Sequence, residues 1–166
     1  MATAPVAGRT DVLGPSDPAL DLPDGDDDLL GHVVRLEILV GQVLDRITTA
    51  HGISAADYLV LGVVRRSPHR RSAPTAICEV LGRTTGGMSL TLDRLERAGW
   101  VRRLPDPSDR RRIVVEATES GSALAASVNA DLHVWESALG ADAGERVALS
   151  GALARLTHLI ESHPHP

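Results

Sequence analysis

Arginine is concentrated in the middle of this 166-residue chain. Residues 65–112 contain twelve arginines and five acidic residues, whereas residues 1–28 contain seven acidic residues and one arginine. A guanidinium group donates several hydrogen bonds in a planar fork, which suits phosphate oxygens. The formal net charge of the chain is −5, but affinity for phosphate depends on the local charge that faces it. The sequence therefore predicts a basic, phosphate-binding region within an acidic protein.

The segment 84–99 has the pattern of a short amphipathic helix. Its apolar residues recur at i, i+4 and i+7, which predicts one buried side made of Met88, Leu92 and Leu95. Thr84 is a suitable N-cap, and Ala98-Gly99 would end the helix.

The opposite side of this helix carries small polar and basic groups, the types that contact base edges and phosphates in a major groove of DNA. The pair Gly86-Gly87 would let another backbone approach closely, although an equally good interpretation is that it only loosens the helix start. The contacts with DNA expected on this helix are Thr84, Thr85, Gly86, Ser89, Thr91 and Arg94.

A second cationic cluster lies in the turn 105–112, between two β-prone runs at 100–104 and 112–117. Such a pattern predicts a hairpin. Asp109 is expected to hold the turn or a neighbouring arginine side chain. Arg110 or Arg111 at the tip would enter a minor groove, where the negative potential attracts guanidinium. The sequence leaves open which of the two does so, and an isolated cluster of this kind is commonly just a solvated turn.

Helical periodicity and capping residues predict the elements that hold these two clusters. Six helices are expected, over about 28–51, 54–67, 74–81, 84–98, 118–139 and 142–160. Residues 69–71 are expected to form a polar connection between the second and third helices. Two short helices followed by a basic hairpin make the layout of a winged helix-turn-helix. The predicted fold is mainly α with a small β-hairpin wing, an α+β arrangement.

Three regions follow from this layout. Residues 1–27 are rich in Pro, Gly and Asp, and are expected to form an irregular acidic arm. Residues 54–117 are expected to form the winged helix-turn-helix. Residues 28–53 and 118–162 supply the remaining helices, whose apolar residues also recur at helical spacing. In the last helix this spacing predicts one inward side, made of Leu149, Leu153, Leu156 and Ile160.

Two motifs in series resemble the multiple antibiotic resistance regulator (MarR) family. The segment 86–99, Gly-Gly-Met-Ser followed by Leu-Asp-Arg-Leu-Glu-Arg-Ala-Gly, is similar to the recognition helix of that family. The segment 106–111, Asp-Pro-Ser-Asp-Arg-Arg, with Thr118 and Gly121, is similar to the family's wing and the start of its fifth helix. The resemblance covers about 29–160.

The resemblance implies an obligate homodimer formed by the first, fifth and sixth helices, which makes 28–53 and 118–162 a helical dimerisation region. It also implies two recognition helices in successive major grooves of a pseudo-palindromic operator. Many members are repressors released by a small aromatic or anionic ligand. Tyr58 and Trp100 could line a cleft for such an effector, although packing is the simpler interpretation of both.

The expected function is therefore that of a cytoplasmic, sequence-specific regulator of transcription that binds double-stranded DNA as a homodimer and has no enzymatic activity. No apolar segment approaches the roughly 20 residues of a membrane span. An alternative is a winged-helix adaptor that binds other proteins and has little DNA specificity. Leu90 on the DNA-facing side, the acidic arm and the net charge of −5 favour that alternative.

Several positions depart from the family pattern. Leu90 and Thr91 stand where relatives with the same Gly-Gly-Met turn usually carry Asn or Lys and then Arg or Ile. Ala73 replaces a common Thr cap, so the third helix should be less firmly capped, by about 1 kcal/mol. Leu59 stands where the urate-responsive branch tends to carry an Asp, which disfavours urate as the effector.

The remaining reactive residue types give no catalytic or metal pattern. The seven histidines form no i, i+4 pair on a helix, so no metal site and no cofactor are expected. Cys78 lies beside Ile77 and Val80 and is expected to be a buried core residue.

Overall fold

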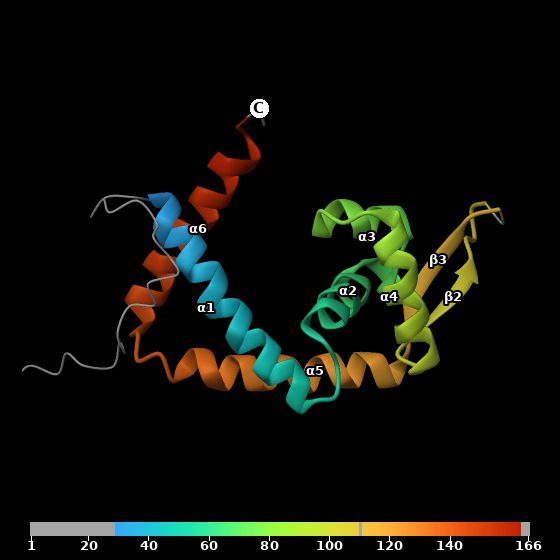
Figure 1. Ribbon diagram of the computed structural model, residues 1–166, viewed down its shortest axis with the longest axis horizontal. Coiled ribbons are helices and arrows are strands. Elements are labelled where there is room, and N and C mark those ends of the chain that lie inside the picture. Colours follow the sequence, from blue (N-terminus) through green and yellow to red (C-terminus); the bar gives the residue numbers. More distant parts are fainter. Residues whose placement is uncertain (1–28, 110, 164–166) are drawn as a thin grey trace, which may run out of the picture. The chain divides into compact units, whose positions relative to one another are not determined.

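The computed structural model describes residues 29–109 and 111–163 (Figure 1). Within it the chain falls into two units that meet at residues 41 and 42, and each is described by itself. The acidic segment 1–27 and Arg110 lie outside the described residues. The elements, in chain order, are α1 (Leu29–Ala50), α2 (Ala55–Arg66), a 3-10 turn (Pro68–Arg70), β1 (Arg71–Ser72), α3 (Pro74–Leu81), α4 (Thr85–Arg97), β2 (Val101–Pro105), β3 (Ile113–Ala117), α5 (Glu119–Ser137) and α6 (Ala143–Glu161).

The fold class predicted from the sequence is confirmed: helices predominate, and the chain also forms one small antiparallel sheet. In Figure 1 the hairpin of β2 and β3 projects beside α4, and α5 runs beneath α2 and α4. The six predicted helices are present, with ends that differ by a few residues from the expected ones. Among the described helices, no single one is long and apolar enough to cross a membrane, although α1 and α2 together meet that test by length and composition.

Local capping explains where several helices begin. The Ser54 hydroxyl accepts the Asp57 backbone N–H at 3.1 Å at the start of α2. A reciprocal capping box of Asp142 and Glu145 opens α6. Thr84 is the N-cap residue of α4, as expected, but its side chain makes no capping hydrogen bond. Only its backbone carbonyl is used, accepting the Met88 N–H at 3.2 Å.

The sheet has three strands in the order β1-β3-β2, one more than the predicted hairpin. The expectation that 69–71 form a plain polar connection is therefore wrong for Arg71, which pairs with Glu116 across β1 and β3. The strand is only two residues long and carries no apolar alternation, so its sequence has no strand pattern. Before it, His69 and Arg70 adopt left-handed backbone angles, with φ of 54° and 57°.

The hydrophobic core of the second unit joins α2, α3, α4, the sheet and the first half of α5. Its largest fully buried apolar side chains are Leu61, Ile77, Met88, Leu92, Leu95, Val60, Val64, Val101, Val115 and Val128. Cys78 is buried in this core as expected. In α6 the outcome differs from the prediction of an inward apolar side, because Leu149, Leu153 and Ile160 are exposed in this single chain.

Candidate nucleic-acid interface

The exposed side of α4 is small and polar at its N-terminal half. Thr84, Thr85, Gly86 and Ser89 are all exposed, as the sequence predicted for a surface that contacts DNA. The Ser89 hydroxyl donates to the Thr85 carbonyl at 3.2 Å, which leaves its oxygen lone pairs on the outside as acceptors. The chain at this point can approach another surface closely, since nothing lies within 4 Å of a side chain added at Gly86.

Thr91 does not belong to this exposed side. Its residue is only 4% exposed, and its hydroxyl accepts a hydrogen bond from Arg94 Nη2 at 3.1 Å. The position follows from helix geometry, because Thr91 lies three residues after Met88 and four before Leu95, within the buried stripe. The burial of Thr91 therefore removes it from the surface that could contact base edges.

Arg94 is held by α2 rather than extended into solvent. Its Nε donates to Asp57 Oδ2 at 3.1 Å and its Nη2 to Asp57 Oδ1 at 2.6 Å, a bidentate arrangement. The Asp57 side chain is 10% exposed and that of Arg94 is 48% exposed. The hydrogen bond that Arg94 donates to Asp57 raises the pKa of the Arg94 guanidinium. Arg94 thus fixes α4 against α2 and leaves part of its surface open.

The hairpin turn is ordered by its own acidic residues. Asp106 Oδ1 accepts the backbone N–H and the hydroxyl of Ser108, at 2.8 and 2.7 Å. These hydrogen bonds, the hydroxyl first, lower the pKa of Asp106. Asp109 Oδ1 accepts the Arg111 backbone N–H at 3.0 Å, so Asp109 holds the turn itself, one of the two roles expected for it. The Arg111 side chain is exposed, and among the described residues it forms no ion pair.

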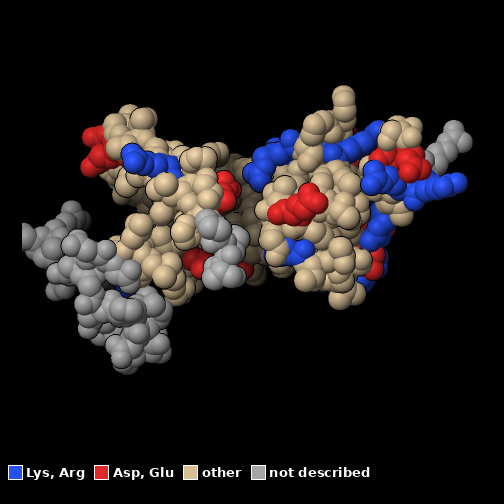
Figure 2. All heavy atoms as spheres, turned by 90° about the horizontal axis from the view of Figure 1, so that it is seen from above, with Lys and Arg blue, Asp and Glu red and all other residues tan. Residues whose placement is uncertain are grey.

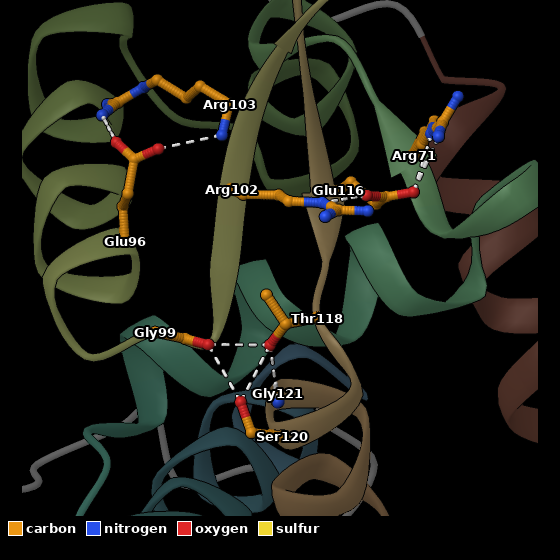
Figure 3. A network of polar contacts seen from close by, with 9 residues as sticks. All are labelled: Arg71, Glu96, Gly99, Arg102, Arg103, Glu116, Thr118, Ser120 and Gly121. Atoms are coloured by element: carbon orange, nitrogen blue, oxygen red, sulfur yellow. Dashed lines mark hydrogen bonds and ion pairs between the residues drawn. The ribbon is translucent and has the colours of Figure 1, made fainter.

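The hairpin is also fixed relative to α4. The backbone N–H and guanidinium of Arg103 on β2 both donate to the Glu96 carboxylate, at 2.9 and 2.5 Å (Figure 3). A further Arg103 nitrogen lies 2.7 Å from Asp93 Oδ1. Because both acids belong to α4, these contacts fix β2, the strand that leads into the arginine-bearing turn, against that helix. Figure 2 shows arginine side chains gathered over the hairpin end of this unit.

A buried carboxylate joins the three strands at the base of the hairpin. Glu116 on β3 is 8% exposed and lies directly across from Arg71 on β1 and Arg102 on β2 (Figure 3). Arg71 Nε donates to Glu116 Oε1 at 2.9 Å, and Arg102 Nε donates to Oε2. The hydrogen bonds from Arg102 and then Arg71 lower the pKa of Glu116. The carboxylate is therefore most stabilising in its charged form.

We expect Glu116→Gln to lower the free energy of unfolding by an amount that depends on pH. A carboxyl whose pKa is lowered by folding stabilises the native state above its unfolded pKa of about 4.3, and this contribution disappears as pH falls through the folded pKa. The loss should be on the order of 1 kcal/mol at pH 7, since both arginine partners are partly exposed to water. Urea titrations at pH 7 and near pH 3 check this, and a constant difference between the two would contradict it.

The start of α5 is joined directly to the turn between α4 and β2. Thr118 Oγ1 donates to the Gly99 carbonyl at 2.7 Å and accepts the Gly121 N–H at 3.1 Å, and Ser120 Oγ also donates to Gly99 at 2.9 Å. The Thr118 N–H donates to the Trp100 carbonyl at 3.1 Å. A side-chain carbon at Gly121 would lie within 2.8 Å of the Trp100 carbonyl carbon and closer still to its oxygen. Glycine is therefore required at this contact between two backbones.

Tyr58 and Trp100, the two residues considered for an effector cleft, both take part in packing. Tyr58 is 7% exposed, and its hydroxyl donates to Asn129 Oδ1 on α5 at 2.6 Å. Burial raises the pKa of the Tyr58 hydroxyl, against the opposing effect of Arg66 and Arg65. Trp100 is partly buried against the same core. Their predicted role in binding a ligand stays a prediction.

Asp57 is the functional candidate that sequence reasoning missed. It stands three residues after Ser54, a spacing typical of a capping box, and the Ser54 side chain accepts the Asp57 N–H. Its carboxylate instead binds Arg94, 37 residues further along the chain. The only available signal was the position of an acid within the buried stripe of α2.

Among the described residues, no group of three or more His, Cys, Asp or Glu could hold a metal ion.

Comparison with known proteins relates this geometry to one family. A family model described as the MarR family matches residues 51–112. The chain is 34% identical over 98 residues to the HTH-type transcriptional regulator PecS of Dickeya dadantii (strain 3937), covering 58% of each protein and so little more than half the length of PecS. It is 33% identical over 117 residues to the multiple antibiotic resistance protein MarR of Escherichia coli (strain K12), covering 64% of this chain and 80% of MarR.

A solved structure of a mutant E. coli MarR complexed with operator DNA has the same fold. It matches with a TM-score of 0.59 and 28% identity, over 78% of this chain and 98% of the other. The residues matched by the family model include α4, β2 and the turn that follows β2. The chain therefore belongs to the MarR family of winged-helix transcriptional regulators.

Proposed function

We propose that this protein binds specific operator sequences in double-stranded DNA and represses transcription. The observation that carries the proposal is that the exposed side of α4 and the hairpin belong to the same unit and are held together by side-chain contacts. The exposed, small polar half of α4 suits a major groove, and Arg103 holds β2, the strand that leads into the arginine-bearing turn, against the same helix through Glu96 and Asp93. Positively charged wing side chains would then contact phosphates or the adjacent minor groove.

The proposed active form is a homodimer. Large apolar side chains on the second half of α5, in the segment after it and along α6 are exposed in the single chain, and they include Val134, Leu139, Val147, Leu149 and Leu153. Burying such side chains against a second copy is favourable by about 25 cal/mol per Å² of apolar surface. Residues 28–53 and 118–162 would form the dimerisation region, 54–117 the DNA-binding region. A small-molecule effector and a cytoplasmic location are part of the same proposal.

One observation favours the adaptor alternative. Leu90 is 65% exposed in the middle of the face that should meet DNA, and a large exposed apolar side chain is also typical of protein–protein contacts. The charge distribution weighs against this alternative, since the same unit carries most of the arginines of the chain. The two functions differ in whether the protein retains duplex DNA and in how retention depends on salt.

Binding to a duplex selected from a random library tests the proposed function. We expect the parent protein to enrich a pseudo-palindromic sequence, and sedimentation of the complex to give two chains per duplex. Arg110→Ala and Arg111→Ala should each weaken binding to selected and unrelated duplexes alike. For each phosphate that a variant no longer neutralises, the slope of log K against log salt should become shallower by about 0.9.

Arg155→Ala provides a matched control, because it removes the same charge from an exposed position on α6, outside the proposed DNA-binding region. It should leave the salt dependence unchanged. Sedimentation of this variant checks that it remains a dimer. The proposal would be overturned if the parent enriched no sequence, or if wing and control variants bound DNA with the same affinity as the parent.

A further inference from the structure

Leu90 is the one large apolar side chain on the exposed side of α4. The apolar requirement of the helix is already met by Met88, Leu92 and Leu95, each at most 2% exposed, whereas Leu90 is 65% exposed. Its contribution to helix propensity is matched by Lys, Gln or Arg, which are better solvated. Neither the fold of this unit nor the helix itself therefore explains leucine at this position.

The position of Leu90 within the helix is one that meets base edges. It is the sixth residue of α4, and recognition helices of this layout contact bases with their N-terminal residues. It lies four residues after Gly86, so both residues are on the same face of the helix. Because Gly86 has no side chain, the helix surface is shallow one turn before Leu90. Next to this shallow surface, the Leu90 side chain is the apolar group that projects furthest from this half of the helix.

The polar groups around Leu90 are largely committed to the protein itself. The Ser89 hydroxyl donates to the Thr85 carbonyl, Thr91 is buried, and two nitrogens of Arg94 are held by Asp57. A guanine edge offers two acceptors in the major groove and requires a donor, which these surroundings supply poorly. The thymine C5-methyl is the apolar group that the major groove presents.

We propose that Leu90 is a specificity-determining residue that packs on a thymine C5-methyl group in each half of the target site. The inference rests on the proposed DNA-binding function and names part of what that surface recognises. Leucine would favour an A·T pair at one position through contact with the methyl group, and would disfavour pairs that present only polar edges there.

Replacing single thymines of the selected duplex by deoxyuridine tests the inference. This change removes the methyl group and keeps the hydrogen-bonding pattern of the base. For the parent, the dissociation constant should rise by about fourfold per half-site at one thymine position, the loss expected for one buried methyl group. For Leu90→Ala the same replacement should have no effect. Fluorescence anisotropy with the full chain measures both.

Val80→Ala is the matched control, since Val80 is 68% exposed and lies on α3. It should keep the parent's sensitivity to the methyl group. If the parent binds a selected duplex but no thymine position depends on Leu90, the inference about Leu90 fails and DNA binding stands. If the parent selects no duplex, both fail. Leu90→Ala is at an exposed site and should melt like the parent. A parent whose affinity is unchanged by deoxyuridine at every thymine position overturns the inference without the variant.

Discussion

Gly121→Ala is expected to destabilise the protein by about 3 kcal/mol or more, the upper part of the range for overpacking. The new side-chain carbon would overlap the carbonyl group of Trp100 and lie 3.0 Å from its Cα. These are backbone atoms, which cannot turn aside as the end of a flexible side chain does. The hydrogen bonds from Thr118 and Ser120 to Gly99 hold the same junction closed, so the overlap cannot be relieved without breaking them.

The expected decrease in melting temperature is roughly 10 °C, at about 2–4 °C per kcal/mol for a chain of this size. Circular dichroism melts of the full chain measure it. Gly62→Ala is the matched control, because Gly62 is also buried and helical but a side-chain carbon there meets only the Arg66 side chain, at 3.6 Å. This control should melt at the parent temperature or slightly above it. The higher helix propensity of alanine should add up to about 1 kcal/mol to the free energy of unfolding. Equal melting of both variants would contradict the argument.

The second large effect concerns the Asp57–Arg94 pair, and it should be asymmetric. Arg94→Ala leaves a carboxylate that is only 10% exposed without its partner, a loss of about 2–3 kcal/mol. Asp57→Ala leaves a guanidinium that is 48% exposed and can turn to water, a loss of about 1 kcal/mol. The double variant should be more stable than Arg94→Ala alone, because removing Asp57 also removes the unpaired buried charge.

DNA binding separates two roles of Arg94. If it positions α4 through Asp57, both single variants should weaken binding to the selected duplex more than binding to unrelated DNA, and the double variant should be no worse than Arg94→Ala. Asp57 is 7% exposed, so it acts on DNA only through its partner. If Arg94 instead contacts a base directly, Asp57→Ala would leave affinity intact. Arg97→Ala, which removes an exposed charge from the end of α4, is the control for the stability measurement.

Periodicity was sufficient to predict the order of the helices and the buried stripe of α4. Thr91 also has the spacing of the buried stripe, three residues after Met88 and four before Leu95, and its burial follows this spacing rather than its polar side chain. β1 could not be predicted, because a two-residue strand is defined by its partner Glu116 rather than by its own pattern. The same holds for Asp57, since its local capping signal gives no indication of a partner 37 residues away.

The apolar residues of α6 show another limit of sequence reasoning. Their spacing correctly indicates that one side of the helix avoids water, but it does not distinguish burial within one chain from burial between two. Leu149 and Leu153 were expected to point inward and are exposed in the single chain. If they are buried against a second copy, as proposed, the same apolar spacing is explained by contact between two chains rather than by contact with the core of one chain.

The junction at Gly121 also determines how motion passes through the molecule. Two backbones in direct contact, with no side chain between them, have little room to slide or compress. Trp100 follows the end of α4 by three residues and is hydrogen-bonded to the residue before α5. A tilt of α5 should therefore move the C-terminal end of α4 with it, as one rigid body. In a homodimer joined through α5 and α6, the angle between the two α5 helices would therefore set the distance between the two copies of α4.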